Sequence, residues 1–131
     1  MIHLYTDGGA RGNPGPAAIG IVALDECGKI YKQKEKIGKT TNNVAEYTAL
    51  IKGLNLLLKA NVKEVNCFSD SELMVKQLNG EYKIKSSNLI PLFEEVERLS
   101  SRFDEIKFFH VPRTNKYIRI ADALVNQALD V

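Results

Sequence analysis

The chain has 131 residues, of which 44% are hydrophobic and 26% are charged, and its formal net charge is only +2. This length and apolar fraction predict one globular domain, residues 1–131, with a buried core, and leave no room for a second catalytic domain. Because the overall charge is nearly neutral, affinity for a polyanion must come from where the basic residues are placed.

The two cysteines, Cys27 and Cys67, form neither a Cys-x-x-Cys pair nor a disulfide framework. No apolar stretch approaches the roughly 18 residues that a membrane-spanning helix needs. No apolar signal segment follows Met1 either. We therefore expect a protein of the reducing cytoplasm without a membrane association.

The first third of the chain predicts three strands joined by hairpins. Short runs of Ile, Val, Leu and Tyr are separated by Gly- and Pro-rich or Asp-Glu-Cys-Gly segments, which favour turns. The predicted strands cover residues 2–7, 18–24 and 29–37. Strands connected in this way pair antiparallel.

The apolar spacing then changes to a helical period. Apolar residues recur on one face of a helix predicted from Asn43 to about Ala60. The remaining predicted elements are a strand at 65–69, helices at 72–78 and 89–102, a strand at 106–111 and a helix from about 117 onward.

The alternation of strands and helices in the second half requires crossover connections, and therefore parallel pairing. The first strand should lie beside the strand that ends at Ser69. The predicted fold class is α/β: a five-stranded mixed sheet, with three antiparallel strands followed by two parallel ones, and with helices on both faces.

Four acidic residues stand where a carboxylate is either structural or functional. Asp7 ends the first predicted strand, where an Asp-Gly turn is the alternative. Glu46 follows Asn43 by three positions, as in a helix capping box. Asp70 stands between a strand and a helix, which it can cap. Asp122 lies near the start of the last helix, where an acid favours the helix dipole and could simply face solvent.

The combined placement of these acids favours a metal site. Asp7 and Asp70 both stand at the carboxyl ends of predicted strands, where ligands gather in open α/β sheets. Neighbouring carboxylates repel one another unless a cation neutralises them. Oxygen ligands without a His or Cys cluster favour magnesium or manganese over zinc.

Four blocks of the sequence together point to a known family. They read YTDGGARGNPGPAAIG, TNNVAEYTAL, SDSELMVKQLNGEYKIK and HVPRTNKYIRIADALVNQALD. In this order and spacing they resemble the type 1 ribonuclease H family, in its compact form without a basic protrusion, over nearly the whole chain. The resemblance implies a ribonuclease H-like fold. The family's four metal-binding acids match Asp7, Glu46, Asp70 and Asp122 one for one.

The resemblance also implies an activity, the hydrolysis of the RNA strand of RNA/DNA hybrids to 5′-phosphate and 3′-hydroxyl ends. Two magnesium ions, or manganese as a substitute, would activate the attacking water and stabilise the leaving oxygen. Asp7 is implied to contact both ions. Cleavage of double-stranded RNA is left open, because both duplexes present A-like grooves and 2′-hydroxyls. We expect a monomer without an obligate protein partner.

A second set of residues is implied in holding the hybrid. Lys39, Thr41 and Asn88 match positions that grip a phosphate of the DNA strand. Asn42 and Asn43 match residues that reach into the minor groove. The predicted substrate-binding set further contains Gly8, Gly12, Asn13 and Ser71. The Gly-Asn-Pro-Gly-Pro loop either brings backbone amides close to the RNA strand or forms a plain rigid turn.

The sequence departs from the family pattern at three places. Many bacterial members carry a histidine in the loop before the last helix; here none follows His110, which we interpret as a structural strand residue. Arg113 remains as the loop residue that would assist catalysis, as a fixed cation. The loop before Asp122 is also longer than in commoner versions. The segment between Gly80 and Asn88 lacks a basic helix, so we expect weaker, strongly salt-sensitive hybrid binding.

Two other functions fit parts of the pattern. A nucleic-acid-binding module with weak catalysis would keep the fold, because fold alone does not determine function. A transposase or integrase core uses similar acid clusters, but the Gly-Asn-Pro-Gly-Pro and Thr-Asn-Asn blocks argue against it. The presence of all four acids favours the nuclease.

Overall fold

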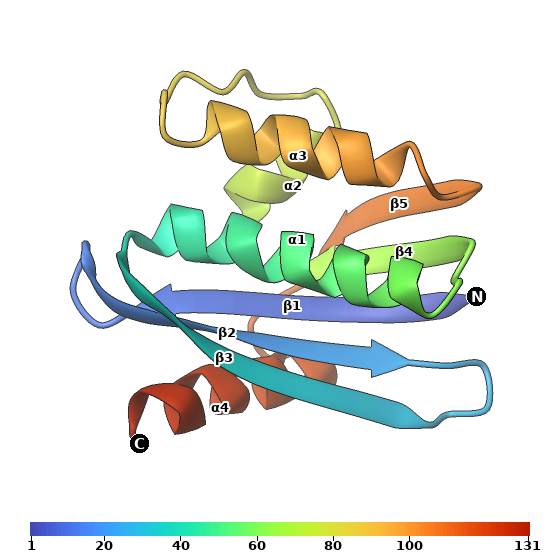
Figure 1. The fold of residues 1–131 in the computed structure, drawn as a ribbon, viewed down its shortest axis with the longest axis horizontal. Coiled ribbons are helices and arrows are strands. Elements are labelled where there is room, and N and C mark those ends of the chain that lie inside the picture. Colours follow the sequence, from blue (N-terminus) through green and yellow to red (C-terminus); the bar gives the residue numbers. More distant parts are fainter.

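The computed structural model describes residues 1–131 as a five-stranded sheet with four helices (Figure 1). The strands are β1 (Ile2–Ala10), β2 (Gly15–Leu24), β3 (Ile30–Thr40), β4 (Glu64–Ser69) and β5 (Glu105–His110). The helices are α1 (Asn42–Lys59), α2 (Glu72–Leu78), α3 (Ile90–Ser100) and α4 (Lys116–Leu129). The predicted order of elements is confirmed.

The strand order in the sheet is β3-β2-β1-β4-β5. β1 pairs antiparallel with β2 and parallel with β4, and β4 pairs parallel with β5. The predicted fold class is therefore confirmed, as is the position of the first strand beside β4. β1 is longer than predicted because its ladder with β2 continues to Ala10, through glycines that look like a turn in the sequence.

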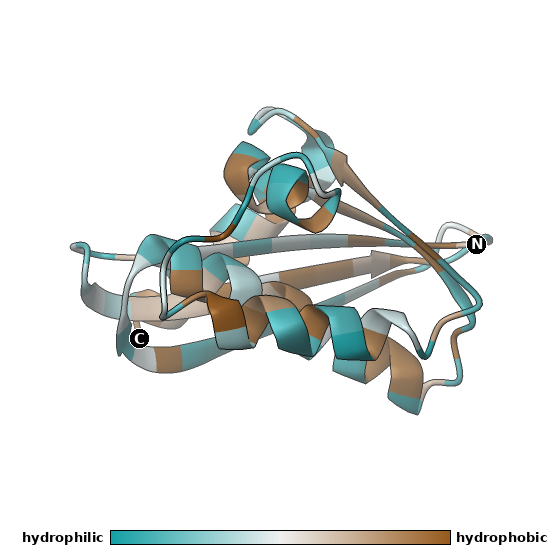
Figure 2. Cartoon of the chain, turned by 90° about the horizontal axis from the view of Figure 1, so that it is seen from above, coloured by the Kyte–Doolittle hydropathy of each residue, from teal (hydrophilic) through white to brown (hydrophobic).

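The helices form a layer on each face of the sheet. α1, α2 and α3 lie on one side, and α4 lies on the other, where it packs on β1, β2 and β3 (Figure 1). Hydrophilic and hydrophobic residues alternate along the helical turns, as amphipathic packing requires (Figure 2). None of the helices is long and apolar enough to cross a membrane.

Three apolar clusters hold these layers together, the smallest of which contains Ala18, Val125 and Ala128. The largest one lies under α1 and includes Tyr47, Leu50, Leu54, Leu4 and Ile19, all almost completely buried. The second lies under α4 and consists of Tyr5, Val22, Ile118, Ala121 and Leu124. The apolar stripe predicted for the first helix thus faces the core.

The start of α1 differs from the predicted capping box. Thr41 is the N-cap, and its Oγ1 accepts a hydrogen bond from the backbone N–H of Val44 at 3.3 Å. Asn43 lies inside the helix, and Glu46 does not fold back onto it. The capping-box interpretation is wrong because the hydroxyl two residues earlier already binds the free amide.

The helix-end interpretations of two other acids also fail, although Asp122 does face solvent. Ser71 caps α2 by accepting from the backbone N–H of Met74 at 3.3 Å, so Asp70 is not the cap. α4 begins at Lys116, and its first turn contains no acidic residue. Asp122 therefore lies deeper in the helix than predicted, and the dipole at the helix start does not explain its position.

Candidate active site

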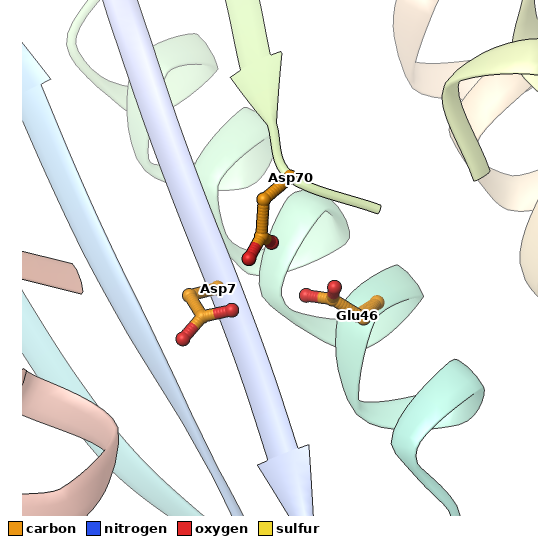
Figure 3. Close-up of side chains that lie close together, drawn as sticks. All are labelled: Asp7, Glu46 and Asp70. Carbon is orange, nitrogen blue, oxygen red and sulfur yellow. The ribbon is translucent and has the colours of Figure 1, made fainter. Parts of the chain in front are cut away.

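Three acidic side chains from separate elements meet beside the carboxyl end of β4 (Figure 3). Asp7 comes from β1, Glu46 from the N-terminal part of α1, and Asp70 from the residue that follows β4. One carboxylate oxygen of each lies within 4.8 Å of those of the other two. The structure thus brings together three of the four acids that the sequence singled out.

Asp7 lies inside β1 and not at its end, which corrects the prediction. The strand continues along β2, but its parallel pairing with β4 ends at Tyr5 and Phe68. Asp7 and Asp70 therefore both stand just beyond the last paired residues of neighbouring parallel strands. Both residues therefore occupy the position at the end of parallel pairing that favours ligands, although β1 itself continues beyond Asp7.

Gly8 brings Glu46 to the other two acids. Its backbone N–H donates a hydrogen bond to Glu46 Oε1 at 2.8 Å. A Cβ at Gly8 would lie 2.6 Å from the Glu46 nitrogen and would overlap the carbonyl group of Ala45. Because only glycine lacks this atom, only glycine allows α1 to lie this close to β1. Gly8 has this structural role whether or not it also contacts a substrate.

The cluster is electrostatically unfavourable when all its carboxylates are ionised. Burial raises the pKa of Asp7 to about 8, with further increases from the charges of Asp70 and Asp122. Burial, then the charges of Asp7 and Asp70, raise the pKa of Glu46 well above its usual value. The pKa of Asp70 is also raised, mainly by burial. These shifts show that the folded chain presents negative charge without enough positive charge to balance it.

The donors of the cluster suit a hard cation. Asp70 Oδ1 is buried and has no hydrogen-bond partner. A buried carboxylate oxygen without a partner is costly, and a cation removes that cost. All the available donors are carboxylate oxygens, the ligand type of magnesium and manganese. The residues present therefore fit a divalent metal ion.

Asp122 approaches the cluster from the opposite face of the sheet. It is exposed on α4 and does not belong to the group of three oxygens within 4.8 Å. Gly20, the partner of Asp7 in the β1–β2 ladder, lies against the backbone of Ala121, the residue before Asp122, and the charge of Asp122 raises the pKa of Asp7. The structure thus places the fourth acid beside Asp7.

Two basic side chains border Asp70. Arg113 Nε lies 3.9 Å from Asp70 Oδ2, and 85% of the arginine side chain is exposed. The charges of Arg113 and His110 both lower the pKa of Asp70. His110 is the last residue of β5, as its interpretation as a strand residue predicted, and it is exposed beside Ser69 of β4.

The β1–β2 hairpin loop is tied to the start of α1. The backbone N–H of Ala10 donates to Asn42 Oδ1 at 2.8 Å, and the backbone N–H of Asn42 donates to Asn13 Oδ1 at 3.0 Å. The loop is thus held in place by hydrogen bonds, and Gly12 within it adopts a positive φ of 97°. These contacts support the rigid-turn interpretation while leaving the loop surface exposed.

The other predicted substrate-binding residues are spread over several elements. Lys39, Asn43 and Asn88 are exposed, and no hydrogen bond or ion pair joins them. Thr41 and Ser71 are partly buried because they cap α1 and α2. Their roles toward a substrate stay predictions.

Comparison with known proteins assigns the class. The sequence profile described as reverse transcriptase-like matches residues 5–128. The crystal structure of RNase H1 from Halobacterium salinarum has a TM-score of 0.94 at 39% identity and covers 98% of this chain and 97% of that chain. LC11-RNase H1, in complex with an RNA/DNA hybrid, has a TM-score of 0.91 at 44% identity and covers 99% and 97%. The fold is that of a ribonuclease H-like domain.

Sequence relatives narrow this class. Ribonuclease HI of Halobacterium salinarum is 40% identical and covers 98% of this chain, which spans 64% of that relative. Bifunctional protein Rv2228c of Mycobacterium tuberculosis is 42% identical over 98% of this chain, which spans only 35% of that relative. The chain belongs to the type 1 ribonuclease H family. Proteins of this family depend on metal ions.

Proposed function

We propose that this chain is an endoribonuclease that hydrolyses the RNA strand of RNA/DNA hybrids. The observation that carries the proposal is the cluster of Asp7, Glu46 and Asp70, with oxygens within 4.8 Å and one buried oxygen without a partner. The names of its relatives support the substrate: one is a ribonuclease HI, and another binds an RNA/DNA hybrid in its crystal. A single copy acting in the cytoplasm stays a prediction.

The four acids, Asp7, Glu46, Asp70 and Asp122, would hold two magnesium ions, for which manganese can substitute. Three of them already offer oxygens to a common point, and Asp122 adds its charge from α4. Ions held there would supply an activated water and charge stabilisation at the leaving 3′ oxygen, and the products would carry 5′-phosphate and 3′-hydroxyl ends.

The chain's own residues orient this chemistry. The Gly8 amide holds Glu46 in one orientation, so the carboxylate does not have to be ordered when substrate arrives. Arg113, beside Asp70 and largely exposed, would act as a fixed cation near the scissile phosphate. It cannot serve as a general base, because it stays protonated.

The side chain of Asn42 has one group, its amide NH₂, that is free to bind a duplex. Its Oδ1 already accepts from the Ala10 amide, which leaves the side-chain NH₂ group as the free part. We infer that Asn42 presents a hydrogen-bond donor, suited to the acceptors of a minor groove and to a 2′-hydroxyl oxygen. This polarity supports recognition of an RNA-containing duplex, whether hybrid or double-stranded RNA.

Substitution of Asp70 tests the proposal. Asp70→Asn should lower hybrid cleavage by about a thousandfold, because several kcal/mol of metal-dependent charge stabilisation is lost. Its affinity for the hybrid should change by less than about threefold, since Asn keeps the shape. The assay uses end-labelled RNA/DNA, RNA/RNA and DNA/DNA duplexes with magnesium, manganese or EDTA. Cleavage of DNA/DNA, or cleavage in EDTA, would refute the proposal, and hybrid binding without any metal-dependent cleavage would indicate a binding module.

A further inference from the structure

β2 carries a glycine where α4 crosses the sheet beside Asp7. Gly20 is the antiparallel partner of Asp7 in the β1–β2 ladder, and directly opposed positions point to the same face of a sheet. A Cβ at Gly20 would lie 3.0 Å from the carbonyl carbon of Ala121 and would overlap its oxygen. The absence of a side chain thus lets the backbone of α4 rest directly on β2.

The residue that touches Gly20 is the immediate neighbour of the fourth acid. Ala121 is completely buried, whereas Asp122, the next residue, is exposed. Leu124 of the same helix also lies close to Gly20, since a Cβ added to this glycine would lie 3.1 Å from the Leu124 Cβ. The height of this part of α4 above the sheet is therefore determined at Gly20, and the position of the Asp122 backbone follows from it.

We propose that Gly20 is a positioning residue, whose missing side chain sets the distance between the Asp122 carboxylate and Asp7. The inference rests on the proposed function, in which Asp122 completes the metal-binding set. Gly8 plays the same part on the other face, where it lets α1 bring Glu46 to Asp7. Two glycines thus control how closely two helices carry their acids to one strand.

A purely structural role is the competing explanation. Ala121 belongs to the apolar cluster under α4, together with Tyr5, Val22, Ile118 and Leu124. If Gly20 served only this packing, a side chain there would lower the melting temperature without a specific effect on metal affinity. The two explanations therefore differ in metal binding, which can be measured without a substrate.

The chain offers a matched control at Gly9. This glycine also lies under α4, but its Cβ would meet only the Val125 Cγ1 atom, at an ordinary 3.5 Å. Gly9→Ala therefore adds the same methyl group under the same helix without lifting it. Gly20→Ala must lift the helix, because the obstacle is backbone, which cannot rotate away.

The experiment compares Gly20→Ala with Gly9→Ala. Calorimetric titration with Mg²⁺, without nucleic acid, should show a dissociation constant raised about tenfold in Gly20→Ala, as when a supporting residue of a metal site is lost. The kcat for hybrid cleavage should fall about a hundredfold, the effect of a displacement near 1 Å. Gly9→Ala should match the wild type in both measurements, and KM for the hybrid should stay within about twofold in both variants, because the contacts to the duplex are unchanged.

A compensating change separates positioning from packing. Asp122→Glu lengthens the side chain by one methylene, so it should lower activity in the wild type but raise it in Gly20→Ala, where the helix lies farther away. Such a reversal of sign is a coupling that additive loss of stability cannot produce. If Gly20→Ala does not fold at the assay temperature, Ala121→Val lifts the same helix from the other side and should show the same rescue.

The outcomes distinguish this inference from the proposed function. Equal magnesium affinity in Gly20→Ala, Gly9→Ala and wild type, or no rescue by Asp122→Glu in either lifted variant, would overturn the positioning role. Absence of hybrid cleavage by the wild type would instead refute the proposed function. In that case the magnesium titration still shows whether Gly20 controls the acid cluster.

Discussion

Two regions of this protein shift the pKa values of acidic side chains in opposite directions. On the surface of α3, Arg98 donates to Glu95 through two hydrogen bonds, of 2.6 and 3.0 Å, which lower the pKa of that glutamate. In the cluster, burial and neighbouring charge raise the pKa values of Asp7, Glu46 and Asp70. The protein neutralises Glu95 with a side chain of its own but leaves the cluster to be neutralised by something else.

This difference separates acids that serve the fold from acids that oppose it. An exposed ion pair is close to neutral for stability, whereas buried like charges without partners reduce it. A fold retains such a cluster only if its charge has a function. Functional sites commonly lower stability in exchange for activity. Four measurements can break or sharpen the comparison.

The largest effect is expected from Asp7→Asn, which removes the most central acid. Hybrid cleavage should fall by at least about a thousandfold, because metal-dependent charge stabilisation is lost. The metal-free variant should unfold at a higher temperature than the wild type, because repulsion with Asp70 and Asp122 disappears. Cleavage kinetics and thermal unfolding in EDTA test both statements. A variant that is inactive but also less stable would contradict the view that the cluster opposes the fold.

The second effect is a pH dependence of stability in the metal-free protein. The pKa of Asp7 is about 8 in the folded state, against 3.8 for the free side chain. Between these values the folded chain keeps a proton that the unfolded chain has released, so stability falls as pH rises. Between these two values the free energy of unfolding falls by about 1.4 kcal/mol for each pH unit. The loss is absent below about pH 4, where both states hold the proton, and complete above about pH 8, where both have released it.

Urea unfolding at several pH values measures this dependence. The difference between wild type and Asp7→Asn isolates the contribution of the cluster from that of the other titrating groups. Magnesium should abolish the difference in slope, because a bound cation favours the ionised acids. Parallel stability curves for the two proteins in EDTA would show that Asp7 is not strained by its surroundings.

A smaller effect is expected at Arg113, the basic residue that borders the cluster. Arg113→Ala should lower kcat about tenfold, the loss of one modest charge interaction with the transition state. Thermal stability should hardly change, because a pair with an 85% exposed arginine contributes little to folding. Arg113→Lys should recover part of the rate, since it keeps the charge but not the planar shape. A large loss of stability in the alanine variant would mean that Arg113 serves the fold.

The smallest effect is expected for the surface pair. Glu95→Gln should leave hybrid cleavage and magnesium affinity unchanged and should shift the melting temperature by less than about 2 °C. The same variant is the matched control for Asp7→Asn, since both replace a carboxylate with an amide. A marked loss of activity would show that α3 influences the cluster and that the two regions are not independent.

The two helices that carry acids show how far sequence reasoning reached. The apolar stripe of α1 was predictable because it depends only on residues three and four positions apart. The capping of α1 was not, since Thr41 and Asn43 are both acceptable caps and only the final backbone path decides between them. Asp122 was placed near the start of α4, although Asn115 caps that helix and Asp122 lies deeper within it.

The glycines illustrate a second limit. In the sequence, Gly8 and Gly9 look like parts of a turn after Asp7, whereas the ladder with β2 keeps them in a strand. Nothing local distinguishes Gly8 and Gly20, which admit no side chain, from Gly9, which does. The distinction depends on helices that arrive from distant parts of the chain.

The sequence by itself determined the fold class, the order of the elements and the four acids that mark the family, because periodicity, turn residues and motif spacing are encoded in the order of residues. Only the tertiary structure decided which acids meet, how strongly they repel and what holds them. Those properties depend on burial and on distances between β1, β4, α1 and α4, which are remote in sequence. For Asp122, the deciding feature is the contact between Ala121 and Gly20 across the sheet.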